Sequence, residues 1–149
     1  MIRYGDWTVG ETLALGHHVF ERDEIIAFAC KFDPQPFHLD AEAARQTPFG
    51  DLCASGWHTA SIWMRLMIAW AQRHPDHDPS ISFISPGIRD VRFPAPVLVG
   101  SRINYTTRID DKRPMASRPG YGIITQETEA RRDDGALTFA MTGIVFVPM

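Results

Sequence analysis

Cysteine is scarce in this sequence: Cys30 and Cys53 are the two present among 149 residues. Two cysteines cannot form a disulfide framework, and their spacing is not that of a zinc site. We interpret both as reduced thiols in the core of a cytosolic protein. No apolar run of the kind found in a secretory signal follows residues 1–7. No stretch approaches the roughly 18 consecutive apolar residues that a membrane span needs. The sequence therefore predicts a soluble, cytoplasmic protein with no secretory signal and no membrane partner.

An excess of positive charge is also missing, since 15 Lys and Arg residues face 18 Asp and Glu residues, for a net charge of −3. A mildly acidic chain has no global electrostatic reason to bind nucleic acid. With 44% apolar and 22% charged residues, the composition is that of an ordinary globular protein. We therefore expect a single domain over residues 1–149, which is long enough to bury about 68–70% of the surface of its unfolded chain.

The first half of the sequence predicts loops and helices. Its first twenty residues read as loop, apart from a short extended piece at 17–21. The helix predicted over 56–73 is apolar almost all round, which indicates burial in a core or against a partner. Helices are expected over 24–31 after the N-cap Asp23, from Asp40 as a second N-cap, and over 56–73.

The second half predicts strands, because turn residues separate segments rich in β-branched side chains. Strands that follow one another through such turns form an antiparallel sheet, so the predicted class is α+β, with the sheet wrapped around the long apolar helix. The expected strands are 88–93, 101–109, 121–131 and 137–147, with a long loop at 110–120 and a hairpin turn at 133–135.

Asp33 and His38 form the first candidate for chemistry. They stand five residues apart across two prolines, which fix φ and lower the cost of holding the loop still. A stiff loop that carries a carboxylate and an imidazole suits general acid–base catalysis, with one water held between the two groups. The alternative is that Asp33 ends the preceding helix and that His38 is an ordinary hydrogen-bonded loop residue.

The second candidate is the segment Ser55–Gly56 at the start of the long helix. The first N–H groups of a helix are unpaired and the helix dipole is positive there. A glycine lets a substrate approach this backbone closely, so a carbonyl oxygen could be polarised as in an oxyanion hole. The alternative is that Ser55 is simply the N-cap and that Gly56 serves packing.

These residues carry a resemblance to a known family. The pattern Asp-x-Gln-Pro-x-His-x-Asp over residues 33–40, followed eighteen residues after the His by Gly56, resembles the signature of the MaoC-like (R)-specific enoyl-CoA hydratase and acyl dehydratase family. That signature is D-x-N-P-x-H-x-D, followed at this interval by the glycine of an H-G-M motif. Residues 91–100 also resemble the family's strand and turn R-F-x-x-P-V-x-x-G.

The resemblance implies a hot-dog fold, in which an antiparallel sheet wraps one long helix. It implies the reversible syn addition of water to a trans-2-enoyl-CoA, which gives a (3R)-hydroxyacyl-CoA, as a reaction of fatty acid metabolism. Asp33 and His38 would be the catalytic dyad, and the Gly56 amide would receive the thioester carbonyl. An acyl-CoA or acyl carrier protein thioester is the implied substrate, no cofactor is expected, and homodimers or higher homo-oligomers with sites near the subunit interface are typical of the family.

The sequence departs from the family pattern around the expected site. Gln35 stands where Asn is usual, and Ser55-Gly56-Trp57 replaces His-Gly-Met. We expect Gln35, Ser55, Trp57 and His58 to contact the substrate, with capping or packing as the alternative for His58.

Two rival functions stay open. A hot-dog thioesterase would need an acidic residue or nucleophile from the long helix, which has no Asp or Glu over 56–73. A non-catalytic acyl-CoA-binding subunit would keep the pocket but have its dyad blocked by Trp57 or His58. The His17-His18 and His74-x-x-His77 pairs lack a third ligand at a recognisable spacing, so no metal site is predicted.

Overall fold

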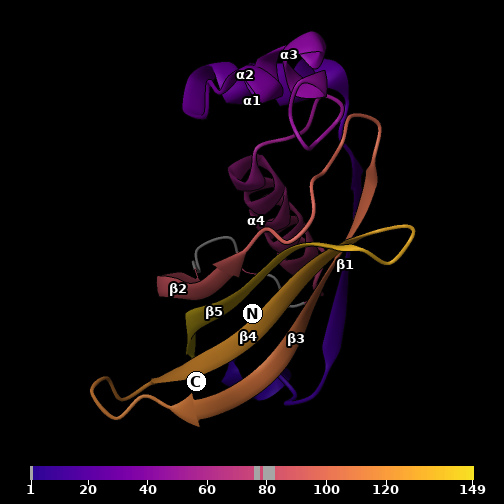
Figure 1. Cartoon of the computed structure of the whole chain (residues 1–149). Coiled ribbons are helices and arrows are strands. Elements are labelled where there is room, and N and C mark those ends of the chain that lie inside the picture. The colour runs from indigo at the N-terminus through magenta and orange to yellow at the C-terminus, as the bar shows by residue number, and fades with distance from the viewer. Residues whose placement is uncertain (1, 76–77, 79–82) are drawn as a thin grey trace.

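Five antiparallel strands form a single sheet in the order β1-β3-β4-β5-β2 (Figure 1). The computed structural model describes residues 2–75, 78 and 83–149. β1 and β2 are the two edges of the sheet. The strands are β1 (Thr12–Val19), β2 (Ile84–Arg92), β3 (Arg102–Pro114), β4 (Tyr121–Arg132) and β5 (Leu137–Pro148).

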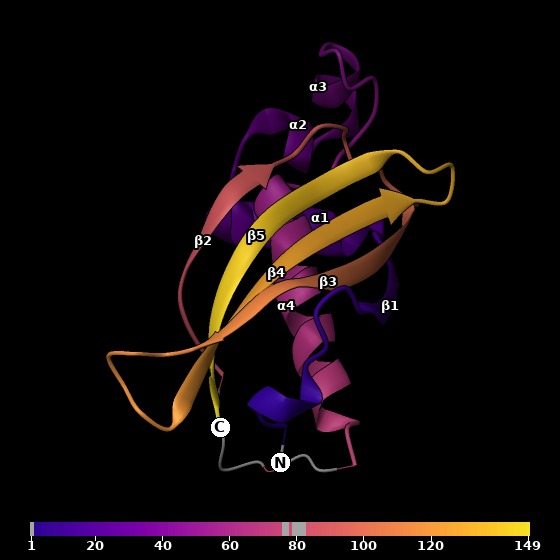
Figure 2. The same ribbon diagram turned by 90° about the horizontal axis from the view of Figure 1, so that it is seen from below.

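The long helix α4 (Gly56–Gln72) lies beneath the curved sheet, as Figure 2 shows. Its buried residues Trp63 and Met67 join the same core cluster as side chains of β3 and β4, and Trp63 Nε1 donates to the Thr107 hydroxyl at 3.2 Å. Buried positions alternate along β3 and β4, as the two-residue period of a strand requires. The sheet wrapped around one apolar helix that the sequence predicts is therefore present.

Three shorter helices gather at one end of the molecule (Figure 1). They are α1 (Arg22–Phe32), α2 (Pro36–Leu39) and α3 (Ala41–Arg45), and a 3-10 turn at Tyr4–Asp6 precedes β1. The Asp40 carboxylate caps α3 by accepting from Ala43 N at 2.8 Å, as predicted. The predicted cap of α1 is wrong, because Asp23 lies inside the first turn and the helix begins after Glu21, whose N–H donates to Glu24 Oε1 at 3.1 Å.

Three strands are longer than the sequence predicts, and register shifts interrupt the pairing of each one. β1 already begins at Thr12, and a bulge between Ala14 and Gly16 breaks its alternation; Gly16 adopts a φ of +120° there. β3 runs on to Pro114 through a register shift between Ile109 and Asp111, so the loop expected over 110–120 begins only after that strand. β2 likewise begins earlier than expected, at Ile84.

Candidate active site

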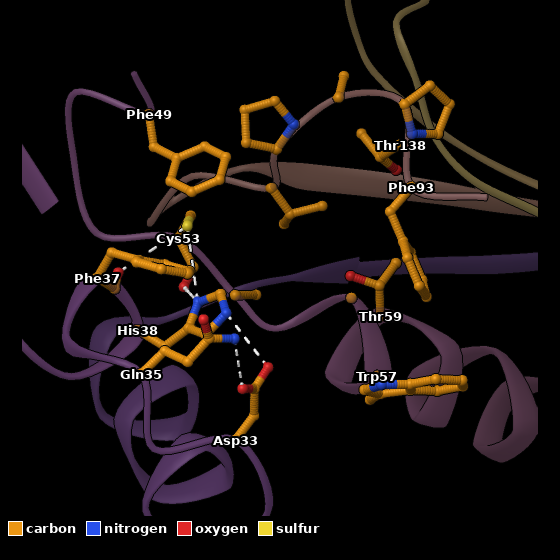
Figure 3. A pocket seen from close by; sticks show the side chains of 16 residues that line it. Asp33, Gln35, Phe37, His38, Phe49, Cys53, Trp57, Thr59, Phe93 and Thr138 are labelled. Atoms are coloured by element: carbon orange, nitrogen blue, oxygen red, sulfur yellow. Dashed lines mark hydrogen bonds and ion pairs between the residues drawn. The ribbon is translucent and has the colours of Figure 1, made fainter. Parts of the chain in front are cut away.

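A cleft of about 310 Å³ opens where three segments meet (Figure 3). The loop after α1 and helix α2 contribute Asp33 and His38, and the first turn of α4 contributes Gly56. Residues 93–97, which follow β2, form the opposite wall. Segments that are far apart in the sequence therefore surround the two residues that the motif singles out.

The carboxylate of Asp33 is held by two neutral donors. The Ser55 hydroxyl donates to Oδ2 at 2.7 Å, and the Gln35 side-chain amide donates to Oδ1 at 2.8 Å. Burial raises the pKa of Asp33, but these hydrogen bonds and the neighbouring His38 outweigh that effect and hold the pKa below its ordinary value. Asp33 is therefore ionised at neutral pH. Gln35 and Ser55, which we expected to contact substrate, bond to this carboxylate.

The His38 ring is fixed from its far side. Its Nδ1 lies 2.7 Å from the carbonyl oxygen of Cys53, and a carbonyl can only accept, so Nδ1 carries a proton. In the neutral form of the ring the lone pair is on Nε2, and this atom lies 3.3 Å from Asp33 Oδ2. Both residues line the cleft, so the structure brings together the carboxylate and the imidazole that the sequence spacing pairs.

The start of α4 is coupled to this pair through Ser55. The Ser55 hydroxyl donates to Asp33 and also accepts from Trp57 N at 3.3 Å, which makes Ser55 the N-cap of the helix, the role given above as the alternative. Gly56 lines the cleft, and a Cβ at this position would lie 2.7 Å from the Phe93 ring. The glycine is therefore required by a close contact as well as by the opening it leaves at the helix N-terminus.

Aromatic side chains form much of the cleft wall. The rings of Phe37 and Phe49 lie 5.1 Å apart, and those of Trp57 and Phe93 lie 5.7 Å apart (Figure 3). Trp57, which we expected to contact substrate, lines the cleft without filling it. The three phenylalanines are absent from the site predicted by the sequence. Phe37 and Phe93 lie within the two motifs, but the motifs do not show that these rings meet Phe49 at one cleft. Such a wall suits an apolar acyl chain.

His58 lies outside the cleft. It is buried between Phe20 and Phe28, with its ring stacked on Phe28 at 4.7 Å. Burial lowers the pKa of His58 to about 4. The negative charge of Glu24 acts in the opposite direction and raises this pKa, but its effect is smaller. His58 therefore has the packing role that was the alternative to substrate contact, and it is not part of the candidate site.

The two cysteines differ in their surroundings. Cys53 is buried at the cleft, and burial, together with the charge of Asp33, raises its thiol pKa to about 11. Cys30 is exposed, so its interpretation as a core residue is wrong. Both thiols are free.

Over the part of the chain that the structure describes, no three His, Cys, Asp or Glu side chains gather as a metal ion would require. Of the paired histidines, His18 is bonded to Glu24 at 2.6 Å and to Arg65 at 3.0 Å, while His77 lies outside the described residues. None of the described helices has the length and apolar character needed to cross a membrane.

Comparison with known proteins gives one family. Residues 8–131 match the model of the MaoC like domain. The solved structure of the MaoC-like dehydratase from Rhodospirillum rubrum superposes with a TM-score of 0.85 at 35% identity, covering 99% of this chain and 97% of that one. An (R)-hydratase from A. caviae superposes with a TM-score of 0.74 at 26% identity, covering 95% and 98% of the two chains.

Among curated proteins, the 3-hydroxyacyl-thioester dehydratase Z of Mycobacterium tuberculosis is 36% identical over 89 residues. The match covers 59% of this chain and 56% of that dehydratase, so it spans about half the length of the relative.

Proposed function

The chain belongs to the MaoC-like dehydratase family and has its hot-dog fold, and from this premise we propose that it adds water reversibly to a trans-2-enoyl thioester. The product is a (3R)-3-hydroxyacyl thioester, carried by coenzyme A or by acyl carrier protein. The names of two relatives, an (R)-hydratase and a 3-hydroxyacyl-thioester dehydratase, support the reaction class. The observation that carries the proposal is the Asp33–His38 pair facing an open cleft.

A water in front of this pair would be oriented by both residues. The ionised Asp33 carboxylate only accepts hydrogen bonds, and in the neutral form of the His38 ring Nε2 is also an acceptor. One water can donate its two protons to these acceptors, which leaves an oxygen lone pair directed into the cleft. The pair thereby positions a nucleophile and provides the base that takes its proton.

The N-terminus of α4 would bind the thioester carbonyl. Gly56 lines the cleft close to the dyad, and the N–H groups of a first helical turn have no helical partners. As the water oxygen bonds to Cβ, the π electrons of the double bond shift to Cα and the carbonyl oxygen, and this N–H stabilises the negative charge. The proton taken by the dyad is then delivered to Cα. The sum is the addition of one water, with no redox change.

We also propose that a second copy of the chain covers one apolar face. This α4–β2 face consists of Trp57, Met64, Ile68, Ile84, Ile88 and Phe93, which are each between 41% and 54% exposed. Met64, Ile68 and Ile88 line one small cavity between helix and strand, so the face is continuous, and β2 is an edge strand. Since Trp57 and Phe93 also line the cleft, the site would border the subunit interface.

The experiment follows the loss of absorbance of the conjugated enoyl thioester when purified protein meets crotonyl-CoA and longer or branched enoyl-CoAs. Turnover by the wild type that falls roughly 10²–10⁴-fold in Asp33→Asn supports the proposal. The matched control is Asp134→Asn, because Asp134 lies in the β4–β5 turn and bonds Arg132 instead of a cleft residue. A wild type that binds these thioesters but turns over none of them contradicts the proposal and favours a binding subunit.

A further inference from the structure

Thr59 carries a buried hydroxyl that has no hydrogen-bond partner among the described residues. The residue is 1% exposed and lines the cleft. In Figure 3 its oxygen points toward the space in front of His38 and Asp33. Buried hydroxyls are normally paired, so an orphan at the wall of a cleft indicates a partner that arrives with the ligand.

The other cleft threonine differs in this respect. The Thr138 hydroxyl is also buried and lines the cleft, but it donates to the carbonyl oxygen of Ala130 at 2.9 Å. Its proton is therefore already used within the protein. Of these two hydroxyls, Thr59 is the one with a free proton to donate.

Helix geometry places the Thr59 hydroxyl beside Gly56. Residues three apart in a helix share a face, and each side chain leans toward the helix N-terminus, over the preceding turn. Because Gly56 has no side chain, no Cβ separates the Thr59 side chain from the Gly56 backbone, and the Phe93 ring lies where that Cβ would be. The candidate carbonyl-binding N–H and the free hydroxyl thus converge on the same part of the cleft.

The position of Thr59 is fixed on both sides of its backbone. Its N–H donates to the carbonyl oxygen of Ser55 at 3.2 Å, and its own carbonyl oxygen accepts from the buried Tyr105 hydroxyl at 3.1 Å. The β-branched side chain adds stiffness at χ1. A donor held in this way does not have to be reorganised during the reaction, which is the property that an oxyanion hole needs.

We propose that the Thr59 hydroxyl donates a second hydrogen bond to the thioester carbonyl oxygen, beside the N–H of Gly56. The inference rests on the proposed hydration and adds a catalytic residue to it. Thr59 neither gains nor loses a proton; its O–H dipole stabilises the negative charge that develops on the carbonyl oxygen. The Phe93 ring, which lies against Gly56, keeps bulk water from this pair of donors.

The test compares Thr59→Val, which removes the hydroxyl at nearly constant volume, with Thr59→Ser, which keeps it. With crotonyl-CoA we expect Thr59→Val to lower kcat by roughly 10²–10³-fold, with a much smaller change in KM, and Thr59→Ser to restore most of the rate. The carbonyl stretch of bound crotonyl-CoA, read by Raman difference spectroscopy, should shift to higher frequency in Thr59→Val, because the carbonyl is less polarised.

Stability separates this role from a structural one. Replacing an unpaired buried hydroxyl by a methyl group should leave the Tm of Thr59→Val equal to or above that of the wild type. The matched control is Thr107→Val, because the Thr107 hydroxyl is buried but bonded to Trp63 and Thr128, away from the cleft. We expect this control to lose Tm and to keep its kcat.

Three results would overturn the inference. One is a wild-type kcat and carbonyl frequency in Thr59→Val while the wild type hydrates crotonyl-CoA; this removes Thr59 but leaves the proposed function intact. Another is a loss confined to enoyl-CoAs that carry a polar group on the acyl chain, which would make Thr59 a specificity residue instead. If the wild type hydrates no enoyl thioester, the proposed function fails and the inference fails with it.

Discussion

Two buried histidines lie near the start of α4, and their surroundings differ. His38 is 6% exposed, has one ring nitrogen bonded to a backbone carbonyl and the other beside Asp33, and lines the cleft. His58 is 5% exposed and lies between two phenylalanine rings, and its Nδ1 has no hydrogen-bond partner among the described residues. Equal burial thus accompanies two different surroundings, and the partners and the adjoining cavity distinguish the imidazole that faces the cleft from the packed one.

The largest expected effect separates the two histidines by activity. His38→Gln removes the ring that we propose to orient water, so kcat/KM should fall roughly 10²–10⁴-fold. The matched variant His58→Gln should keep its kcat/KM, because His58 does not line the cleft. Both are measured on the same enoyl-CoA with folding checked by circular dichroism. An equal loss in the two variants would contradict the distinction.

Gly56→Ala tests the helix end beside His38. The new Cβ would lie 2.7–2.8 Å from three atoms of the Phe93 ring, so the ring or the helix end must move. Since about 1 Å of misplacement can cost about 10²-fold, we expect a loss of that order in kcat/KM. Gly87→Ala is the control, because a Cβ there meets nothing within 4 Å. Full activity in Gly56→Ala would show that the carbonyl does not bind at this amide.

Ser55→Ala tests how the Asp33 carboxylate beside His38 is held in place. Without the Ser55 hydroxyl the pKa of Asp33 should rise toward its ordinary value, so the acid limb of the pH–activity profile should move to higher pH. In the wild type, the pKa of Asp33 is lower in the folded protein than in the unfolded chain, so ionised Asp33 stabilises the fold at pH values above its unfolded pKa. This stabilisation is lost as the pH falls through the folded pKa of Asp33. Loss of the N-cap hydrogen bond should lower the free energy of unfolding by about a further 1 kcal/mol. Ser55→Thr keeps the hydroxyl, and its profile should stay near that of the wild type.

The smallest effect concerns His58 and stability alone. Its pKa of about 4 lies below the ordinary value of 6.5, so the unfolded chain takes up a proton first as pH falls. The contribution of His58 to stability is therefore lost between about pH 6.5 and pH 4. As the pH is lowered through this range, the Tm of His58→Phe, measured by calorimetry, should fall by a few degrees less than the Tm of the wild type. Parallel Tm curves would contradict the assignment of His58 as a neutral packed residue.

The α4–β2 face gives a prediction independent of the histidines. Ile88→Asp places a charge at a side chain that is 47% exposed and apolar, on the edge strand. We expect the wild type to be a dimer and the variant to dissociate, as read by light scattering after size exclusion. A monomeric wild type would overturn the proposed homodimer.

The same comparison shows what could be predicted from the sequence. The spacing of Asp33 and His38 across two prolines and the interval to Gly56 are local, so the motif located the side chains that meet at the cleft and the start of the helix. His58 was placed at the substrate although it lies two residues after Gly56, which is about 200° around a helix and therefore on the other side. Attention to helix geometry would have corrected this prediction.

Other parts of the site could not be read from local pattern. Phe93 reaches Gly56 from the segment after β2, and such a contact depends on the whole fold. The hydroxyl of Thr59 became informative only when the structure showed that it has no partner, in contrast to Thr138. In the sheet, bulges at Gly16 and near Asp111 broke the alternation, which hid most of β1 and the end of β3.

The most direct test of the central claim is the stereochemical course of hydration in deuterium oxide. Crotonyl-CoA is incubated with the wild-type protein, and the product is analysed by chiral chromatography and NMR. Delivery of both water hydrogen and water oxygen from the face that holds Asp33 and His38 predicts one deuterium at Cα, syn to the new hydroxyl, and the proposed reaction predicts the (3R)-hydroxybutyryl-CoA. A deuterium anti to the hydroxyl would contradict addition by this dyad, and a (3S) product would contradict the proposed (R)-hydration.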